Sequence, residues 1–284
     1  MRFRLVAATV VVAFLTCGCG QSAPPNQVVA TAPVDTRQGS SYPKLPFDDY
    51  ELTPEQREDL ENLVDRVTRR CMRAAGFDST SGFPAGTGWI ARTIREYKSR
   101  RYGVTDPGIS RAHGYRLSRE SRGTADPKPL DSVSGEEGQA VGACGRRARG
   151  VVRAVDDDAS AQRVGDLGVQ VFRRTVSDDR VRAAFVDWSD CMREHGHAYQ
   201  DPFRAAGDPR WDGEGDTPSA VQIGVALDDI SCKGRTRLVA VASTVEAEYQ
   251  NAELDRNPEV FARARQELTK RGALLSRLLR ENPA

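Results

Sequence analysis

The feature that most constrains this chain is a short motif that occurs twice, each time where an amphipathic helical pattern ends. Each copy contains a cysteine, a methionine, an arginine and a later glycine: Cys71, Met72, Arg73 and Gly76, then Cys191, Met192, Arg193 and Gly196. One further cysteine follows each copy, Cys144 or Cys232. A cysteine beside the apolar face of a helix can be bridged to a neighbouring helix, so the repeat predicts two related helical units.

Apolar residues recur at helical spacing through most of the chain. In the first helix, Thr53 can cap, Pro54 takes the first helical position and Gln56 completes a capping box. Similar patterns predict helices from about 134 to 152, around 164 to 172, from 177 to 196, from 217 towards 249, and from 257 onward. The sequence contains no alternating strand patterns and no glycine-rich phosphate loop, which excludes the β and nucleotide-binding α/β classes. We therefore predict an all-α fold.

Four cysteines remain after residue 50, namely Cys71, Cys144, Cys191 and Cys232. An even number in an exported chain indicates disulfides, with three possible connectivities. The repeat favours Cys71 with Cys144 and Cys191 with Cys232, one bridge in each unit. Zinc ligation is the alternative, but there is no Cys-x-x-Cys spacing and the chain has only 3 histidines. We therefore predict no metal site and no cofactor.

Residues 1 to 20 have the layout of an export signal. Arg2 and Arg4 precede an apolar run from 5 to 15, and Cys17 and Cys19 follow it. The end of this run resembles a bacterial lipobox, in which a small residue precedes a cysteine that becomes acylated. Gly18 before Cys19 fits that pattern better than Thr16 before Cys17, so we predict lipidation at Cys19, with Cys17 or a plain secretory signal as alternatives. Two acyl chains would hold the protein firmly on a membrane.

The predicted organisation has four parts: a lipoprotein signal peptide at 1–18, a disordered tether at 19–50, and helical units at 51–157 and 158–284. The tether is predicted from a composition rich in Pro, Ser, Thr, Ala and Gln. Unit 1 carries a basic segment from Arg92 to Arg122 with nine basic and three acidic residues. We expect a solvated loop there, although arginine and tyrosine side chains can also bind phosphate or polysaccharide. The net charge of +1 predicts no nucleic-acid partner.

The second half resembles a known group of proteins. The resemblance rests on a spaced set of residues: Trp188, Cys191, Met192 and Gly196, followed by Ala226, Asp229 and Cys232. This pattern is similar to that of secreted lipoproteins of unknown function that are abundant in actinobacteria, and it covers the leader and roughly residues 177 to 280. The resemblance implies an extracytoplasmic location and disulfides, and it supplies no activity. The first copy of the motif departs from it, with Thr68 in place of the tryptophan and Val141 in place of the aspartate.

These features favour a lipid-anchored protein on the extracytoplasmic face of the cell membrane, with a non-catalytic binding or structural role in the envelope. Its expected partners are the membrane, through the N-terminal lipid, and another envelope protein or an anionic wall polymer. One alternative is a cell-wall hydrolase with a site between 78 and 131, where Ser110 and His113 only faintly resemble a nucleophile and its base. The other alternative is a carrier that holds a small apolar ligand between helices.

Overall fold

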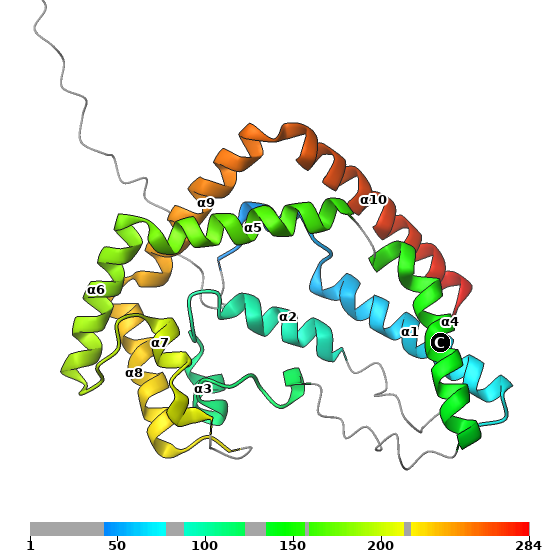
Figure 1. Cartoon of the computed structure of the whole chain (residues 1–284), viewed down its shortest axis with the longest axis horizontal. Coiled ribbons are helices and arrows are strands. Elements are labelled where there is room, and N and C mark those ends of the chain that lie inside the picture. The colour runs from blue at the N-terminus through cyan, green and yellow to red at the C-terminus, as the bar shows by residue number, and fades with distance from the viewer. Residues whose placement is uncertain (1–42, 78–87, 123–134, 157–158, 213–216, 284) are drawn as a thin grey trace, which may run out of the picture. The chain divides into compact units, whose positions relative to one another are not determined.

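The computed structural model describes residues 43–77, 88–122, 135–156, 159–212 and 217–283 (Figure 1). Within these ranges there are ten α-helices and no β-strand, which confirms the all-α prediction. The α-helices are α1 (Pro54–Ala74), α2 (Trp89–Ser99), α3 (Pro107–His113), α4 (Gly135–Asp156), α5 (Ala159–Ser177), α6 (Asp179–Glu194), α7 (Pro202–Ala206), α8 (Ala220–Thr236), α9 (Leu238–Arg256) and α10 (Pro258–Glu281). Three short 3₁₀ helices accompany them: η1 (Pro46–Tyr50), η2 (Glu120–Arg122) and η4 (Pro209–Trp211).

The ends of the main helices follow the local chemistry of the sequence. At the start of α1, the backbone nitrogen of Gln56 donates to Thr53 Oγ1 at 3.2 Å, and Gln56 Oε1 accepts from the Thr53 nitrogen at 3.0 Å. This reciprocal pair is the predicted capping box. Asp178 caps α6 through a 2.9 Å bond from the Arg180 nitrogen. The long pattern after residue 217 is divided in the structure, because Arg237 adopts a left-handed conformation (φ 55°) that ends α8 and begins α9.

Both predicted disulfides are present. Cys71 bonds Cys144 and thereby joins α1 to α4, with the two Cα atoms 5.5 Å apart. Cys191 bonds Cys232 and joins α6 to α8, with a Cα separation of 5.7 Å. Both separations lie in the range that an unstrained bridge requires. The repeated motif therefore marks two helix pairs, each closed by its own disulfide.

The C-terminal helix connects the two expected units. One apolar cluster contains Leu63 from α1, Val152 from α4 and Leu275 from α10, so residues from both sides of position 157 share one core. A second cluster joins Phe47 to Val164 of α5 and to Phe261 of α10. Figure 1 shows α10 running on from α9 towards α1 and α4. The boundary predicted between 157 and 158 thus separates two parts of a single packed body.

The folded body also begins earlier than predicted. Residues 43–50 were expected to belong to a disordered tether, but η1 occupies 46–50, and Phe47 and Tyr50 are 5% and 8% exposed. Both rings contact Phe261, with centroid separations of 5.0 and 4.9 Å. Two aromatic rings near the end of a polar segment can order it by burying their area. The rest of the tether and the signal peptide lie outside the described residues.

No helix among the described residues has both the length and the apolar character needed to cross a lipid bilayer.

Candidate functional site

The residues that carry the lipoprotein resemblance meet at one place, between α6 and α8. Trp188 Nε1 donates to Asp229 Oδ1 at 2.9 Å, one helical turn from the Cys191–Cys232 bridge. Trp188 and Asp229 are both 0% exposed. Their packing explains why this spacing occurs in the sequence: the tryptophan and the cysteine of α6 contact the aspartate and the cysteine of α8.

Asp229 is also part of a buried ion pair. Lys233 Nζ lies 2.8 Å from Asp229 Oδ2 and donates to the carbonyl oxygen of Val104 at 3.0 Å. Burial raises the pKa of Asp229 and lowers that of Lys233, and each partner's charge opposes the shift of the other. Gly103 allows the close approach, because a Cβ there would lie 2.5 Å from Lys233 Nζ. Through the bond from Lys233 to Val104, the pair holds the segment after α2 against α8.

The same bridge lies beside a histidine. Potential ligand atoms of Cys191, Cys232 and His195 lie within 4.8 Å of one another. The two sulfurs are bonded to each other, so neither is a thiolate that could bind zinc. Near them, Asp228 Oδ2 lies 2.8 Å from Nε2 of His197, and Asp228 Oδ1 lies 3.4 Å from Nδ1 of His195. These contacts hold the turn that follows α6.

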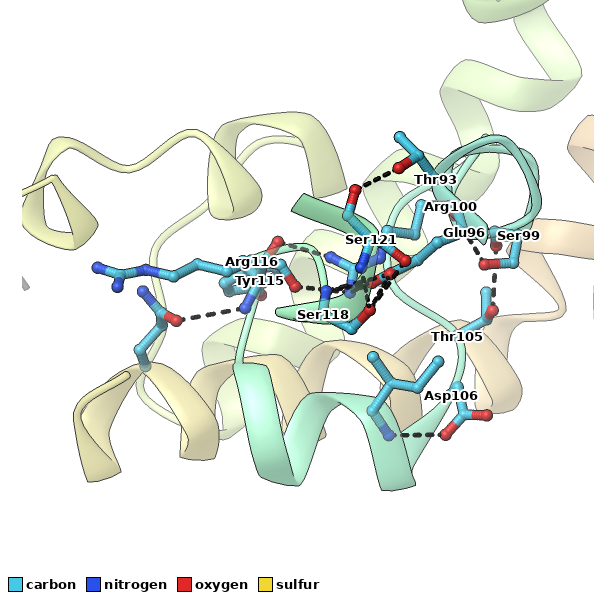
Figure 2. A network of polar contacts seen from close by, with 12 residues as sticks. Thr93, Glu96, Ser99, Arg100, Thr105, Asp106, Tyr115, Arg116, Ser118 and Ser121 are labelled. Carbon is cyan, nitrogen blue, oxygen red and sulfur yellow. Dashed lines mark hydrogen bonds and ion pairs between the residues drawn. The ribbon is translucent and has the colours of Figure 1, made fainter. Parts of the chain in front are cut away.

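A second polar network holds the basic segment in place (Figure 2). Glu96 of α2 accepts from the Ser118 nitrogen at 2.9 Å and from Ser118 Oγ at 2.8 Å, and it pairs with Arg100. Arg100 donates to the carbonyl oxygens of Tyr115 and Arg116, each at 2.7 Å. Burial raises the pKa of Glu96, but hydrogen bonds from Ser121 and Ser118 and the charge of Arg100 outweigh it, so the pKa is below its ordinary value. The segment is folded on both sides of α3, contrary to the expected solvated loop.

Part of the charge of the basic segment is directed at acidic groups of this chain. Arg95 lies 3.1 Å from Glu55, Lys98 lies 2.6 Å from Asp48, and Arg101 pairs with Glu246. With Arg100, at least four of the nine basic residues are thus engaged in ion pairs. Ser110, the candidate nucleophile in this segment, is 0% exposed. The segment therefore contributes part of its charge to folding, and its serine is inaccessible to a polymer substrate.

A groove lies where η1, α2, α5 and α9 meet. It has a volume of about 460 Å³, within the size range of small-molecule sites in proteins. Its lining combines apolar residues, two glycines and charged residues: Leu45, Phe47, Asp48, Glu51, Lys98, Arg101, Val164, Gly165, Gly168, Val169, Phe172, Arg173 and Gln250. These positions span 45 to 250, so the groove forms only when both halves of the chain have packed together. We refer to this set as the α5 groove.

One wall of the α5 groove is fixed by Glu246, which is 0% exposed. Its carboxylate accepts from Arg101 Nε at 2.8 Å, from the Tyr102 hydroxyl at 2.7 Å and from Gln250 Nε2 at 3.0 Å. The Gln250 Oε1 atom in turn accepts from the Phe47 nitrogen at 2.8 Å. Burial and the adjacent carboxylate raise the pKa of Tyr102, so it stays a neutral donor. This cluster sets the position of the Arg101 guanidinium in the wall.

The opposite wall is one face of α5. Val164, Gly165, Gly168, Val169, Phe172 and Arg173 recur at helical spacing along it. A Cβ added at Gly165 would meet no atom within 4 Å, and one at Gly168 would lie 3.8 Å from the ring of Phe47. The missing side chains therefore open the groove. Val169 is 53% exposed, and the Arg101 guanidinium lies 4.9 Å from the centroid of the Phe172 ring.

The sequence-predicted site residues thus fall into two groups. The four body cysteines form the predicted bridges, whereas the lipidation site Cys19 and its alternative Cys17 lie outside the described residues. The α5 groove was not predicted. A local signal for it exists, since Gly165 and Gly168 interrupt the apolar face of a helix between Val164 and Phe172.

Comparisons of the chain with protein-family models, with curated proteins and with solved structures found no match.

Proposed function

We propose that this chain is a lipid-anchored protein on the extracytoplasmic face of the cell membrane, and that its folded body binds a ligand without catalysing a reaction. The extracytoplasmic location is supported by the leader that ends in Cys17 and Cys19, and by two disulfides, which persist in oxidising compartments. The observation that carries the binding role is the α5 groove, an open, mainly apolar site with fixed walls.

The charged groups near the groove fit binding better than catalysis. Lys98 is partly buried, which lowers its pKa, but the bond to Asp48 and the charge of Glu51 outweigh burial and raise the pKa above its ordinary value. Arg101 is also held as a cation by Glu246. Neither cation can act as a general base at neutral pH. Asp229 and Lys233 are 0% and 3% exposed and bonded to each other, so this pair does not reach a substrate.

The alternative role of the basic segment, binding of an anionic wall polymer, has weaker support. Because Arg95, Lys98 and Arg101 already pair with acidic residues, little of their charge is offered to a polyanion. A carrier role for a small ligand has a specific observation in its favour, namely the groove itself. We therefore place the binding role at the groove.

Anchoring is tested by cell fractionation. Replacing Cys19 by alanine should move most of the protein from the membrane to the soluble fraction, whereas Cys17→Ala should leave it in the membrane. Intact-mass measurement of the wild-type protein should show an N-terminal diacylated cysteine. Retention of both variants in the membrane would overturn the proposed anchor.

Binding is tested by native mass spectrometry of the protein isolated from its membrane. The wild-type protein should carry a non-covalent small molecule, and Gly165→Phe, which fills the groove, should not. Gly150→Phe is the matched control, since Gly150 is an exposed helical glycine with nothing within 4 Å of its Cβ position and lies outside the groove. Equal loads in wild type and Gly165→Phe would contradict a binding role for the groove.

A further inference from the structure

The α5 groove has two chemically different ends. Gly165 lies beside Val164 in the first half of α5, and Gly168, at the middle of the helix, lies across from Phe47. Arg173 lies eight residues after Gly165 on the same helix face, a distance of about 12 Å along the helix. The groove therefore has an apolar notch at one end and a guanidinium at the other.

Arg173 differs from the other cations of the groove. Lys98 is engaged by Asp48 and Glu51, at 2.6 and 3.0 Å, and Arg101 is engaged by Glu246. The Arg173 side chain is exposed, and no ion pair or hydrogen bond joins it to any residue that the structure describes. An arginine in this state can offer two parallel N–H donors to one anionic group.

Between the two ends the lining is apolar. Val169 is 53% exposed and Phe172 is partly buried, and both line the groove between the notch and Arg173. A bound hydrocarbon chain would cover Val169 and the neighbouring aromatic ring. Each Å² of apolar surface covered in this way would contribute roughly 25 cal/mol to the free energy of binding. The lining thus complements a ligand with an apolar chain and one terminal charge.

We infer that the α5 groove binds a single-chain amphiphile with an anionic head group, with the chain in the glycine notch and the head on Arg173. This inference rests on the proposed binding function and adds the class of ligand. Asp48 and Glu51 at the far wall disfavour a second anionic group there, so a molecule with one charged end fits better than a polyanion.

The test uses the purified full chain with Cys17 and Cys19 replaced by alanine, so that no acyl group of its own competes. The probe is a long-chain polyene fatty acid whose fluorescence rises when it leaves water, and the corresponding alcohol is the comparison. We expect saturable binding of the acid, with the alcohol at least about tenfold weaker, because it loses a charge-assisted bond to arginine.

Two pairs of variants locate the site. Gly165→Phe should abolish binding, while Gly150→Phe should preserve it; phenylalanine is no worse a helix former than glycine, so neither change should unfold its helix. Arg173→Glu should weaken the acid about tenfold or more and leave the alcohol unchanged. Arg182→Glu makes the same change in charge at an exposed position of α6 and should have no effect. Circular dichroism and thermal unfolding confirm that each variant is folded.

Several results would overturn the inference. Equal affinity for acid and alcohol would show that the groove does not recognise an anionic head group, although the groove would keep its binding role. Acid binding that survives Gly165→Phe, or the absence of saturable binding, would also refute the inference. Failure of the binding role itself is detected separately, by native mass spectra that do not distinguish wild type from Gly165→Phe.

Discussion

The two disulfide-bridged helix pairs have the same connectivity but different surroundings. Around the second bridge, Cys191 and Cys232 are 1% and 0% exposed and lie in a large cluster with Trp188. The first bridge lies in a small cluster, where Cys71 is only partly buried and Met72 and Val141 are its buried neighbours. Where the second pair has Trp188 bonded to Asp229, the first has Thr68 and Val141. The same cysteine spacing therefore forms a fully buried bridge beside a hydrogen-bonded polar pair in one half, and a partly buried bridge without such a pair in the other.

The largest expected effect comes from removing each bridge. The bridges close loops of 73 and 41 residues, for which chain entropy gives about 4 kcal/mol each, slightly more for the longer loop. We expect the opposite order. The double variant Cys191→Ala/Cys232→Ala should lower the free energy of unfolding more than Cys71→Ala/Cys144→Ala does, because it also leaves a cavity in the larger core. Urea unfolding of both double variants measures the difference. A larger loss at the first bridge would mean that packing around the bridges does not matter.

The second prediction concerns the buried ion pair. Asp229→Ala leaves the Lys233 ammonium buried without its carboxylate and should lower the free energy of unfolding by about 3–5 kcal/mol. At the corresponding position of the first copy, Val141→Ala removes two buried carbons and should cost about 1–2 kcal/mol. The double variant Asp229→Leu/Lys233→Met should recover most of the loss. Equal losses for Asp229→Ala and Val141→Ala would show that the pair contributes nothing specific.

The third prediction compares Trp188 with its counterpart Thr68. Trp188→Phe removes a donor from a buried carboxylate and should destabilise the protein by about 1–3 kcal/mol. Thr68 is 2% exposed, and its hydroxyl has no hydrogen-bond partner among the described residues. Thr68→Val replaces that hydroxyl by a methyl group of similar size and should stabilise the protein by up to about 1 kcal/mol. Thermal or urea unfolding tests whether the two substitutions change the stability in opposite directions. Destabilisation by Thr68→Val would mean that the Thr68 hydroxyl does have a hydrogen-bond partner.

The smallest effect is expected at the starts of the two motif helices. Asp178 caps α6, and hydrogen bonds from Arg180 and Tyr249 outweigh burial and lower its pKa from 3.8 to about 2. Since the folded pKa is the lower one, this group stabilises the fold above about pH 4, and the contribution is lost as the pH falls from about 4 to about 2. Asp178→Asn should cost about 0.5–1 kcal/mol at pH 7, clearly less near pH 2, and nothing once the pH is well below the folded pKa. Thr53, the neutral cap of α1, is the control: Thr53→Asn should show no such pH dependence.

The parts of the fold that depend on local chemistry could be predicted from the sequence. The capping box of Thr53 and Gln56, the start of α6 at Asp178 and both cysteine pairs follow from neighbouring residues or from the repeat. The basic segment could not be predicted, because the partners that order it lie far away: Lys233 bonds Val104, and Glu246 bonds Tyr102. The groove was missed for the same reason, since its walls come from residues 45 to 250. The number of basic residues in a segment does not show which of them form ion pairs with acidic residues elsewhere in the fold.

The packing of α10 on α1 and α4 has a consequence for the order of events during folding. Contacts such as Arg66 to Asn282 and Tyr50 to Arg265 join residues more than 200 positions apart, so closing them carries a large loop entropy. The first helix to be synthesised thus lacks one of its apolar partners until the last has been made. If the chain is threaded across a membrane from its N-terminus, as the proposed leader requires, this delay keeps the early part loosely folded during transit. Under that proposal, synthesis of the final helix would set the time at which the fold is completed, on the far side of the membrane.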